Sequence, residues 1–408
     1  MESERNRFSL KVRRLPEGGR VPWDEVCAVM DDEGMRAVLC YSPESGVRVF
    51  DLGLDAALGL SDLGDCCEAR AFRSAAQGLP QAAWCRFAIG SERTFDVRHA
   101  PLRLTLSERF EPRDDFGVWL KGFEAVAEVL ETLALGSSAK GGGRRSLLGA
   151  VAGDIIGSRF EWKNHKSKEF RLFDLSCAAT DDSVLTVAVA SAIRRARAGE
   201  GALSELTARA LREAVRTYPH AGYGARFGLW AADESAGPYG SCGNGSAMRA
   251  SACGYAASTL EEAADLAETT AAVTHNHPDG IAGAVATAKA VFLARSGASK
   301  ADIKAAVEGC GYPLSRRLDE IRPGYRFEAL CAGTVPPAVQ AFLESEDYPD
   351  AIRNAVSLGG DSDTLAAIAG AIAGAFYGIP EPICAAARLY LHQPLRAELD
   401  RFDACFCR

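Results

Sequence analysis

The sequence predicts two domains, a small N-terminal α+β domain over residues 1–135 and an all-α domain over 147–408. Three observations lead to this prediction. Alternating apolar and polar residues dominate the first third of the chain, and helical periodicity dominates the rest. Between them, GSSAKGGGRRS at 136–146 has the composition of a flexible linker. At 408 residues, the chain is also long for a single core.

The N-terminal part contains several strand candidates. MRAVLCY and GVRVFDL flank the turn signal SPESG and predict a hairpin, and AAWCRFAI, TFDVRH and LRLTL are further candidates. An amphipathic helix is expected over 116–135. The single histidine of this part, His99, is interpreted as structural, and no catalytic constellation is recognised here.

The C-terminal part predicts a succession of helices without sustained strand alternation. They are expected at 146–160, 181–199, 203–218, 260–274, 280–297, 302–310, 336–345, 348–359 and 362–378. The first and last of these each carry glycine every fourth residue, namely Gly149, Gly153 and Gly157, and Gly370, Gly374 and Gly378. Glycine inside a helix costs about 1 kcal/mol relative to alanine, so such a row needs a reason. We expect these two helices to pack closely at the domain centre.

Composition restricts the class of protein. Hydrophobic residues make up 48% and charged residues 25%, as in globular proteins, and the formal net charge is −8. This charge argues against a broad nucleic-acid surface or attraction to an anionic membrane, but it does not exclude a local basic pocket. The 13 cysteines are scattered without a C-x2-C pair, which favours reduced thiols over a zinc or disulfide framework.

The sequence shows neither a signal peptide nor a membrane span. The opening residues, MESERNRFSLKVRR, lack an apolar core. The longest uncharged run, from Thr364 to Pro380, is shorter than a typical span of about 20 residues. We expect a cytoplasmic protein that does not enter a membrane.

Two acidic segments precede long uncharged helices, ATDDSVLTVAVA and GGDSDTLAAIAG. They contribute Thr180, Asp181, Asp182, Asp361, Asp363 and Thr364. Each segment alone is typical of a helix N-terminus. If the two ends converge, the repulsion among their carboxylates must be relieved, either by protonation or by a hard cation such as Mg²⁺ with oxygen ligands. The repetition favours the cation.

Two further segments could bind a ligand. Gly243-Asn244-Gly245 precedes Ser246 in GNGSAMR, which fits either an anion-binding turn or a simple capped turn. THNHP contains His275 and His277, which we expect to point in different directions, so that at most one faces a given site.

These motifs together resemble the ADP-ribosylglycohydrolase family. GAVAGDIIGSRFEW, TDDS, GYG, GNGSAMR, THNHP and GGDSDT stand in that family's order, over approximately residues 146–395. The resemblance implies an all-α ADP-ribosylglycohydrolase-like catalytic domain. It also implies a dinuclear Mg²⁺ centre, with Mn²⁺ as the alternative ion. The ligands that it implies are Thr180, Asp181, Asp182, Asp361, Asp363 and Thr364.

The resemblance further implies how substrate is bound and cleaved. Glu161 corresponds to a mobile glutamate near the scissile bond, and it or the aspartates Asp181 and Asp182 would guide a proton. The turn Gly243, Asn244, Gly245 and Ser246 would bind a diphosphate, and His275 would lie near the distal ribose. The expected activity is hydrolytic release of ADP-ribose from a protein, a nucleic acid or a small molecule.

Other interpretations stay open. A non-enzymatic ADP-ribose-binding or toxin-blocking protein could keep this fold, and another Mg²⁺-dependent nucleotide hydrolase could use the same carboxylates. The roughly 140 residues before the family's core are a departure, because that core is usually a complete protein. They suggest a protein partner, for example an ADP-ribosylating toxin or its target. The segment 225–240 has no pattern that identifies the acceptor.

Overall fold

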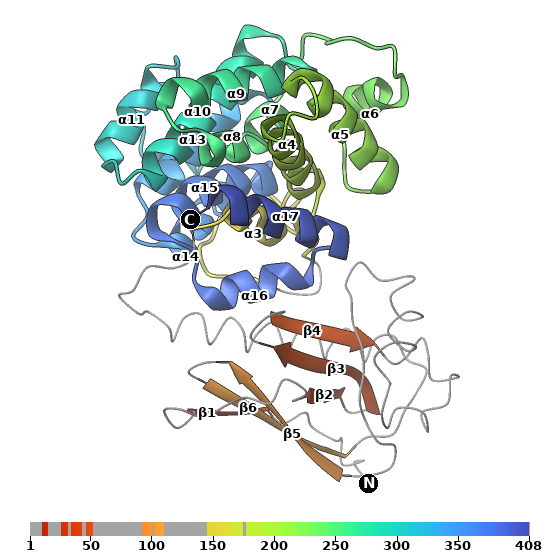
Figure 1. The fold of residues 1–408 in the computed structure, drawn as a ribbon. Coiled ribbons are helices and arrows are strands. Elements are labelled where there is room, and N and C mark those ends of the chain that lie inside the picture. Colours follow the sequence, from red (N-terminus) through yellow and green to blue (C-terminus); the bar gives the residue numbers. More distant parts are fainter. Residues whose placement is uncertain are drawn as a thin grey trace. The chain divides into compact units, whose positions relative to one another are not determined.

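The computed structural model describes residues 145–173 and 177–407, together with six strands nearer the N-terminus (Figure 1). The chain divides into two units, which are treated separately here. The expected strand AAWCRFAI, the expected helix at 116–135 and most of the linker lie outside the described residues. The domain bounds stay a prediction.

The N-terminal strands form two three-stranded antiparallel sheets, in the orders β1-β6-β5 and β2-β3-β4. Their bounds are β1 Leu10–Arg14, β2 Val26–Asp31, β3 Gly34–Ser42, β4 Gly46–Asp51, β5 Glu92–His99 and β6 Leu102–Arg109. The predicted hairpin is confirmed, because β3 pairs with β4 from Ser42 opposite Gly46 to Ala37 opposite Asp51. TFDVRH and LRLTL lie in β5 and β6, as expected.

The described residues from 145 onward form helices, which confirms the all-α prediction for this part (Figure 1). Their bounds are α3 Leu148–Ser158, α4 Asp181–Arg197, α5 Leu203–Thr217, α6 Ala225–Ala232, α7 Gly245–Met248, α8 Ser251–Ala256, α9 Leu260–Ala272, α10 Pro278–Arg295, α11 Lys300–Glu308, α12 Leu318–Ile321, α13 Cys331–Leu343, α14 Tyr348–Val356, α15 Ser362–Tyr377, α16 Glu381–Leu389 and α17 Gln393–Phe406. In the part of the chain that the structure describes, no helix has the length and hydropathy needed to span a bilayer.

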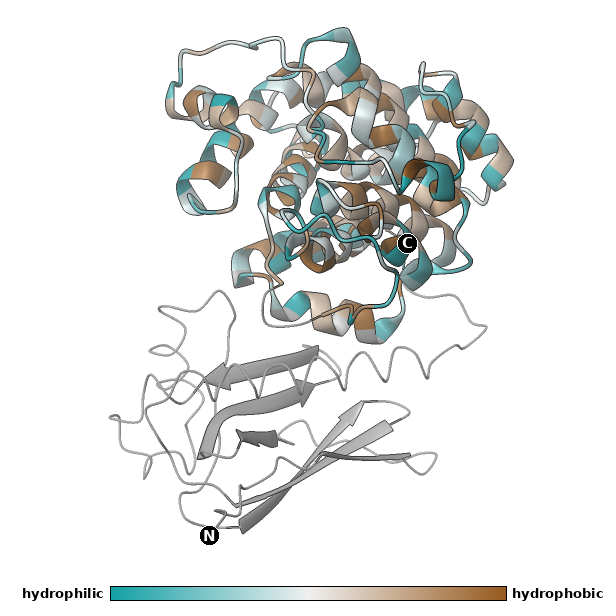
Figure 2. Cartoon of the chain, turned by 180° about the vertical axis from the view of Figure 1, so that it is seen from behind, coloured by the Kyte–Doolittle hydropathy of each residue, from teal (hydrophilic) through white to brown (hydrophobic). Residues whose placement is uncertain are grey.

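Helices α3 and α15 lie at the centre of the helical unit. α15 is buried from Ser362 to Ala375 and α3 from Leu148 to Gly157. A helix buried on all sides is apolar all round, which explains why each of these sequences carries only one charged residue, Asp154 in α3 and Asp363 in α15. The hydropathy colouring in Figure 2 shows hydrophilic residues mainly on the surrounding helices and connections.

The glycine rows bring these two helices into backbone contact, as predicted. A Cβ atom placed on Gly153 would lie 2.0 Å from the carbonyl oxygen of Ala366, and one on Gly149 would lie 2.7 Å from that of Gly370. Any side chain at these positions would separate the helices. The prediction is wrong for Gly378, because α15 ends at Tyr377 and Gly378 terminates it with φ +79°.

The helix expected to begin at Pro336 begins instead at Cys331, with Pro336 and Pro337 inside it. Proline has no N–H, so Pro337 leaves the Gly333 carbonyl without its usual helical donor. The Tyr325 hydroxyl donates a 3.0 Å hydrogen bond to that carbonyl. A side-chain hydroxyl outside α13, eight residues before Gly333, therefore supplies a donor that the prolines remove, and the helix starts about one and a half turns earlier than the sequence suggests.

Candidate metal and substrate site

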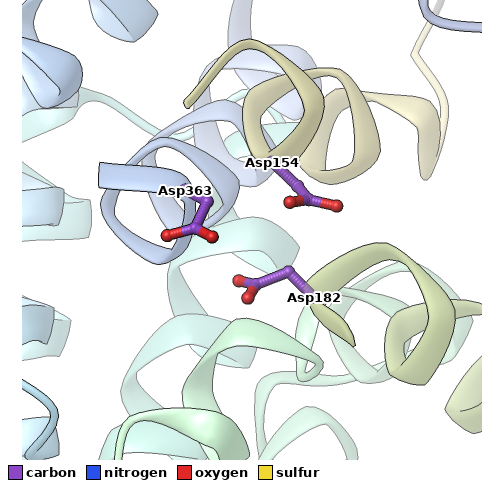
Figure 3. A group of neighbouring side chains, drawn as sticks. All are labelled: Asp154, Asp182 and Asp363. Carbon is purple, nitrogen blue, oxygen red and sulfur yellow. The ribbon is translucent and has the colours of Figure 1, made fainter. Parts of the chain in front are cut away.

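The two acidic segments converge, as the sequence predicts, and a third helix joins them. Asp182 lies in the first turn of α4, Asp363 in the first turn of α15, and Asp154 on α3. Figure 3 shows their carboxylates directed toward one another, and one oxygen of each lies within 4.8 Å of the others. Glu161, Asp361 and Asp363 form a second group by the same measure.

Asp154 was not identified from the sequence, although it is fully buried and groups with Asp182 and Asp363. Its Oδ1 accepts a 2.6 Å hydrogen bond from the Thr180 hydroxyl, and its Oδ2 accepts 3.0 Å bonds from the backbone N–H groups of Thr180 and Ser183. The Ser183 hydroxyl also donates to Oδ2. Asp154 therefore fixes the beginning of α4, which carries the TDD motif. The available signal was a lone carboxylate inside an uncharged helical segment.

Asp182 has an oxygen that no described group satisfies. Its Oδ2 accepts a 3.2 Å hydrogen bond from the Thr364 hydroxyl, which links α4 to α15. Its Oδ1 is buried and has no hydrogen-bond partner among the described residues. A buried carboxylate oxygen without a partner is costly, so a cation is the fitting companion for it.

Asp361 is held by the glycine turn. It accepts a 2.6 Å hydrogen bond at Oδ2 from Asn244 Nδ2, and the same amide lies 3.1 Å from the Thr334 hydroxyl. The neighbouring Asp363 accepts a 3.0 Å bond at Oδ1 from the backbone N–H of Thr364. These contacts orient both carboxylates without supplying a positive charge.

The carboxylates repel one another and are removed from water. Burial, reinforced by Asp154 and Asp361, raises the pKa of Asp181 to about 8. Burial also raises the pKa of Glu161 to about 7 and that of Asp154 to about 6. The pKa values of Asp182, Asp361 and Asp363 are raised too, chiefly by burial. This oxygen-rich set, short of positive charge, fits a hard divalent cation.

All of these carboxylates except that of Asp154 border a cavity of about 610 Å³. Every predicted site residue except Ser246 is among those that line it: Glu161, Thr180, Asp181, Asp182, Gly243, Asn244, Gly245, His275, Asp361, Asp363 and Thr364. Trp162, Tyr223, Arg226, Phe227, Tyr239, Arg249 and Phe327, which the sequence analysis did not select, also line the cavity.

The glycine turn faces the cavity mainly through its backbone. The Asn244 amide is engaged with Asp361, and the Asn244 N–H donates a 2.7 Å bond to Ala329. The Ser246 hydroxyl points elsewhere and donates a 2.6 Å bond to the Gly280 carbonyl. A Cβ on Gly245 would lie 3.4 Å from His275 Nε2, so glycine leaves room beside the histidine ring.

His275 lies in the site and His277 does not. His275 is buried and borders the cavity, whereas His277 is exposed and caps α10 by accepting from the Asp279 N–H. Burial, with the charges of Arg249 and Arg226, lowers the pKa of His275 well below its usual value. The imidazole is therefore neutral near pH 7.

A hydrogen-bond chain selects the tautomer of His275. Arg249 Nη2 donates a 2.8 Å bond to the Thr274 hydroxyl oxygen, and that hydroxyl lies 2.7 Å from His275 Nδ1. Because arginine only donates, the Thr274 hydrogen is free to bond Nδ1. This arrangement favours the tautomer with the ring proton on Nε2, which is the nitrogen beside the glycine turn.

Arg249 is a buried cation with unused donors. It is 2% exposed, and its Nε and Nη1 have no hydrogen-bond partner among the described residues. Burial lowers its pKa to about 10, which leaves it charged at neutral pH. A buried guanidinium beside a cavity favours an anionic ligand there. In the sequence, the only sign of a role for Arg249 is its place at the end of the GNGSAMR motif.

The sequence of the chain was compared with those of known protein families and proteins. The family model described as ADP-ribosylglycohydrolase matches residues 138–403. The chain is similar to ADP-ribosylhydrolase ARH3 of Gallus gallus, with 30% identity over 34% of this chain and 50% of that protein. It is similar to ARH3 of Xenopus tropicalis, with 26% identity over 58% of this chain and 87% of that protein.

A bacterial relative and a solved structure also match. ADP-ribosyl-[dinitrogen reductase] glycohydrolase of Rhodospirillum rubrum is 28% identical over 42% of this chain and 55% of that protein. A solved structure titled "ADP-ribosylglycohydrolase-related protein complex" matches with a TM-score of 0.46 at 25% identity, over 60% of this chain and 95% of that one. The chain spans about half the length of the first curated relatives it matches. Since the family model covers well over half of its residues, the chain belongs to the ADP-ribosylglycohydrolase family.

Proposed function

We propose that this protein is a metal-dependent hydrolase that removes ADP-ribose from a modified acceptor by cleaving the C1″ glycosidic bond. The observation that carries the proposal is that one cavity is lined both by the carboxylate cluster and by the buried guanidinium of Arg249. ADP-ribose needs both environments, because its diphosphate is anionic and its reacting ribose carries hydroxyls that a hard cation can bind.

The metal ligands are the side chains that the sequence singled out. Two Mg²⁺ ions, or Mn²⁺ ions, would be held by Thr180, Asp181, Asp182, Asp361, Asp363 and Thr364. The unpartnered Oδ1 of Asp182 supports this assignment. The chemistry that such ions supply is Lewis acidity beside the ribose hydroxyls and a lowered pKa for the attacking water.

The protein's own groups bind and orient the substrate. Arg249 would donate from Nε and Nη1 to the diphosphate beside Gly243 and Gly245, and His275 would donate from Nε2. Remote binding of this kind supplies free energy for positioning the distal ribose.

Glu161 is the proposed proton-handling group. Its pKa of about 7, raised by burial and by Asp361 and Asp154, lets it take up and release a proton near neutral pH. Cleavage breaks the bond between C1″ and the acceptor oxygen or nitrogen and develops oxocarbenium character at C1″. The water that adds to this carbon loses a proton, and the departing acceptor atom gains one. A half-buried carboxylate bordering the cavity is suited to receive the proton that water loses.

The test is incubation of the protein with ADP-ribosyl-arginine, an ADP-ribosyl-serine peptide and ADP-ribosylated nucleic acid, with Mg²⁺ or with EDTA. Free ADP-ribose should appear from at least one substrate with Mg²⁺ and not with EDTA. Phosphate release from an unmodified nucleotide, without ADP-ribose release, would favour a nucleotide hydrolase. Tight ADP-ribose binding without turnover would favour a non-enzymatic binding protein.

A further inference from the structure

Two large aromatic side chains are exposed at the border of the cavity. Trp162 is 78% exposed and Phe327 is 45% exposed, yet both line the pocket. Their rings are stacked, with centroids 4.8 Å apart and an angle of 11° between the ring planes. Trp162 directly follows Glu161 in the sequence, so the pair lies next to the proposed proton-handling group rather than in a core.

The segments that carry the two rings are tied together. The Lys166 ammonium donates a 2.8 Å hydrogen bond to the Tyr325 carbonyl and a second bond to the Leu358 carbonyl. Tyr325 is anchored in turn through its hydroxyl to Gly333 at the start of α13. The stacked pair is therefore held in place before any ligand binds, which lowers the entropic cost of binding.

Each ring has an exposed cation as its chain neighbour. Lys163 follows Trp162 and Arg326 precedes Phe327, and both side chains are exposed. The Arg326 guanidinium donates to the carbonyls of Pro323 and Tyr325, which leave its charge uncompensated. Glu161 and Glu328 are the other chain neighbours of the two rings, so charges of both signs lie beside the pair in the sequence. An open aromatic face with cations beside it is a combination that binds single-stranded nucleic acid, in which bases stack and phosphates pair with cations.

Resting on the proposed function, we infer that the Trp162–Phe327 pair is the acceptor platform and that the acceptor is a nucleic acid strand. A base of the strand stacks on the exposed aromatic surface, while neighbouring phosphates contact Lys163 and Arg326. A serine acceptor has no planar face to stack. The net charge of −8 disfavours a broad nucleic-acid-binding surface, but it is compatible with a small binding patch formed by Trp162, Phe327 and their neighbouring cations.

Binding of an unmodified strand tests the platform directly. The full-length protein should bind a single-stranded oligonucleotide of about 12 nucleotides, and Trp162→Ala or Phe327→Ala should weaken it roughly 5- to 100-fold. Trp162→Tyr, which keeps a ring, should retain most of the affinity. The matched control is Leu229→Ala, since Leu229 is 75% exposed on α6 and does not border the cavity.

Salt dependence tests the cations separately. Lys163→Gln and Arg326→Gln should each reduce the slope of log affinity against log salt by about 0.7, the value for one phosphate contact on a single strand. Arg209→Gln, which changes an exposed cation on α5, should leave the slope unchanged. If the wild-type protein does not bind the strand, or if Trp162→Ala binds it equally well, the inference is wrong.

Turnover separates this inference from the proposed function. With ADP-ribosylated oligonucleotide, Phe327→Ala should raise KM with kcat largely retained, while Leu229→Ala, which lies outside the cavity, should change neither value. If Phe327→Ala instead loses activity on a modified peptide and not on the oligonucleotide, the acceptor is a protein and the inference fails although the activity stands. If the wild-type protein releases ADP-ribose from none of these substrates, the proposed function itself fails.

Discussion

Asn244 Nδ2 donates a 2.6 Å hydrogen bond to Asp361 Oδ2, joining the glycine turn to the carboxylate that precedes α15. The turn and the acidic segment lie 117 residues apart in the sequence. Through this bond, the group proposed to bind a cation and the turn proposed to bind a diphosphate are positioned by one amide. A change at Asn244 should therefore disturb both ends of the substrate site.

We predict that Asp182→Asn or Asp361→Asn abolishes hydrolysis while the fold is retained. Each substitution removes a negative charge that the bound cations need. The loss should exceed the ~10–100-fold effect typical of residues that only support metal ligands. Rates of ADP-ribose release and Mg²⁺ affinity by calorimetry provide the measurement, with Asp265→Asn, an exposed carboxylate on α9, as the control. Near-normal activity with near-normal Mg²⁺ affinity in either variant would contradict the assignment of that aspartate.

Glu161→Gln should lower kcat by about 10²–10⁴ with little change in ADP-ribose affinity. Glutamine keeps the size of the side chain but cannot take up a proton. Single-turnover rates and equilibrium binding of ADP-ribose separate the two effects. Comparable losses in turnover and affinity would mean that Glu161 binds substrate rather than handling a proton.

The metal-free protein should become less stable as the pH rises. Folding raises the pKa of Asp154 from 3.8 to about 6 and that of Asp181 from 3.8 to about 8. Between about pH 4 and pH 8 the folded state therefore binds more protons than the unfolded state, and its free energy of unfolding falls as pH increases. Thermal unfolding in EDTA across this range measures the slope.

Saturating Mg²⁺ should flatten this pH dependence, because a cation replaces the protons that relieve the repulsion. Asp181→Asn should also reduce the slope in EDTA. A melting temperature in EDTA that rises between pH 6 and pH 8 would show that the carboxylates are already compensated without a cation.

His275 should remain neutral, with its proton on Nε2, at pH values well below the usual histidine pKa of about 6.5. Nitrogen chemical shifts of the imidazole in the full-length protein report both the charge and the tautomer. The urea-unfolded chain gives the reference titration. Thr274→Val removes the hydroxyl that bonds Nδ1 and should allow the other tautomer to appear. A folded His275 that titrates near pH 6.5 would contradict the hydrogen-bond chain.

Residues 146–408 should fold and cleave ADP-ribosyl-arginine if arginine is an accepted linkage, since all proposed ligands lie beyond the linker. The starting residue matters, because the Ser146 hydroxyl and the Leu147 N–H both donate to the Asp403 carboxylate in α17. The segment 149–408 is the control and should be less stable.

A large modified substrate tests residues 1–135. If these residues recognise the acceptor, removing them should slow cleavage of a modified protein or nucleic acid more than cleavage of the small substrate. Equal rates for full-length and shortened protein on both substrates would exclude recognition. An inactive 146–408, under conditions where the full chain works, would show that the first part completes the core or the site.

The convergence of the metal site could be predicted because its parts are local patterns. TDD and GGDSDT each stand before an uncharged helix, and the glycine rows indicate which helices are central. Asp154 carries no such pattern. Its importance comes from four hydrogen bonds to Thr180 and Ser183, residues that lie 26 and 29 positions away.

The remaining features depend on contacts between distant segments. The stacking of Trp162 on Phe327 joins residues that are 165 positions apart. The sequence around each ring does not distinguish an exposed aromatic residue from one in the core. The early start of α13 involves a nearer contact, the bond from the Tyr325 hydroxyl to the Gly333 carbonyl eight residues further on, which helix propensity does not take into account. Arg249 can be recognised as a candidate anion-binding residue only from the structure, which shows that its buried Nε and Nη1 have no hydrogen-bond partner among the described residues.

The backbone contact between α3 and α15 limits how this site can change. With Gly153 against Ala366 and Gly149 against Gly370, no rotatable side chain lies between the helices at these points. The spacing between the main chains that carry Asp154 and Asp363 is then set by backbone contact. A slip of one residue would move one helix about 1.5 Å along its axis, several times the tolerance of about 0.2 Å that metal–ligand distances allow. Substitutions elsewhere in the core can alter the protein's stability, but the separation of these carboxylates should be preserved among functional variants as a nearly fixed length.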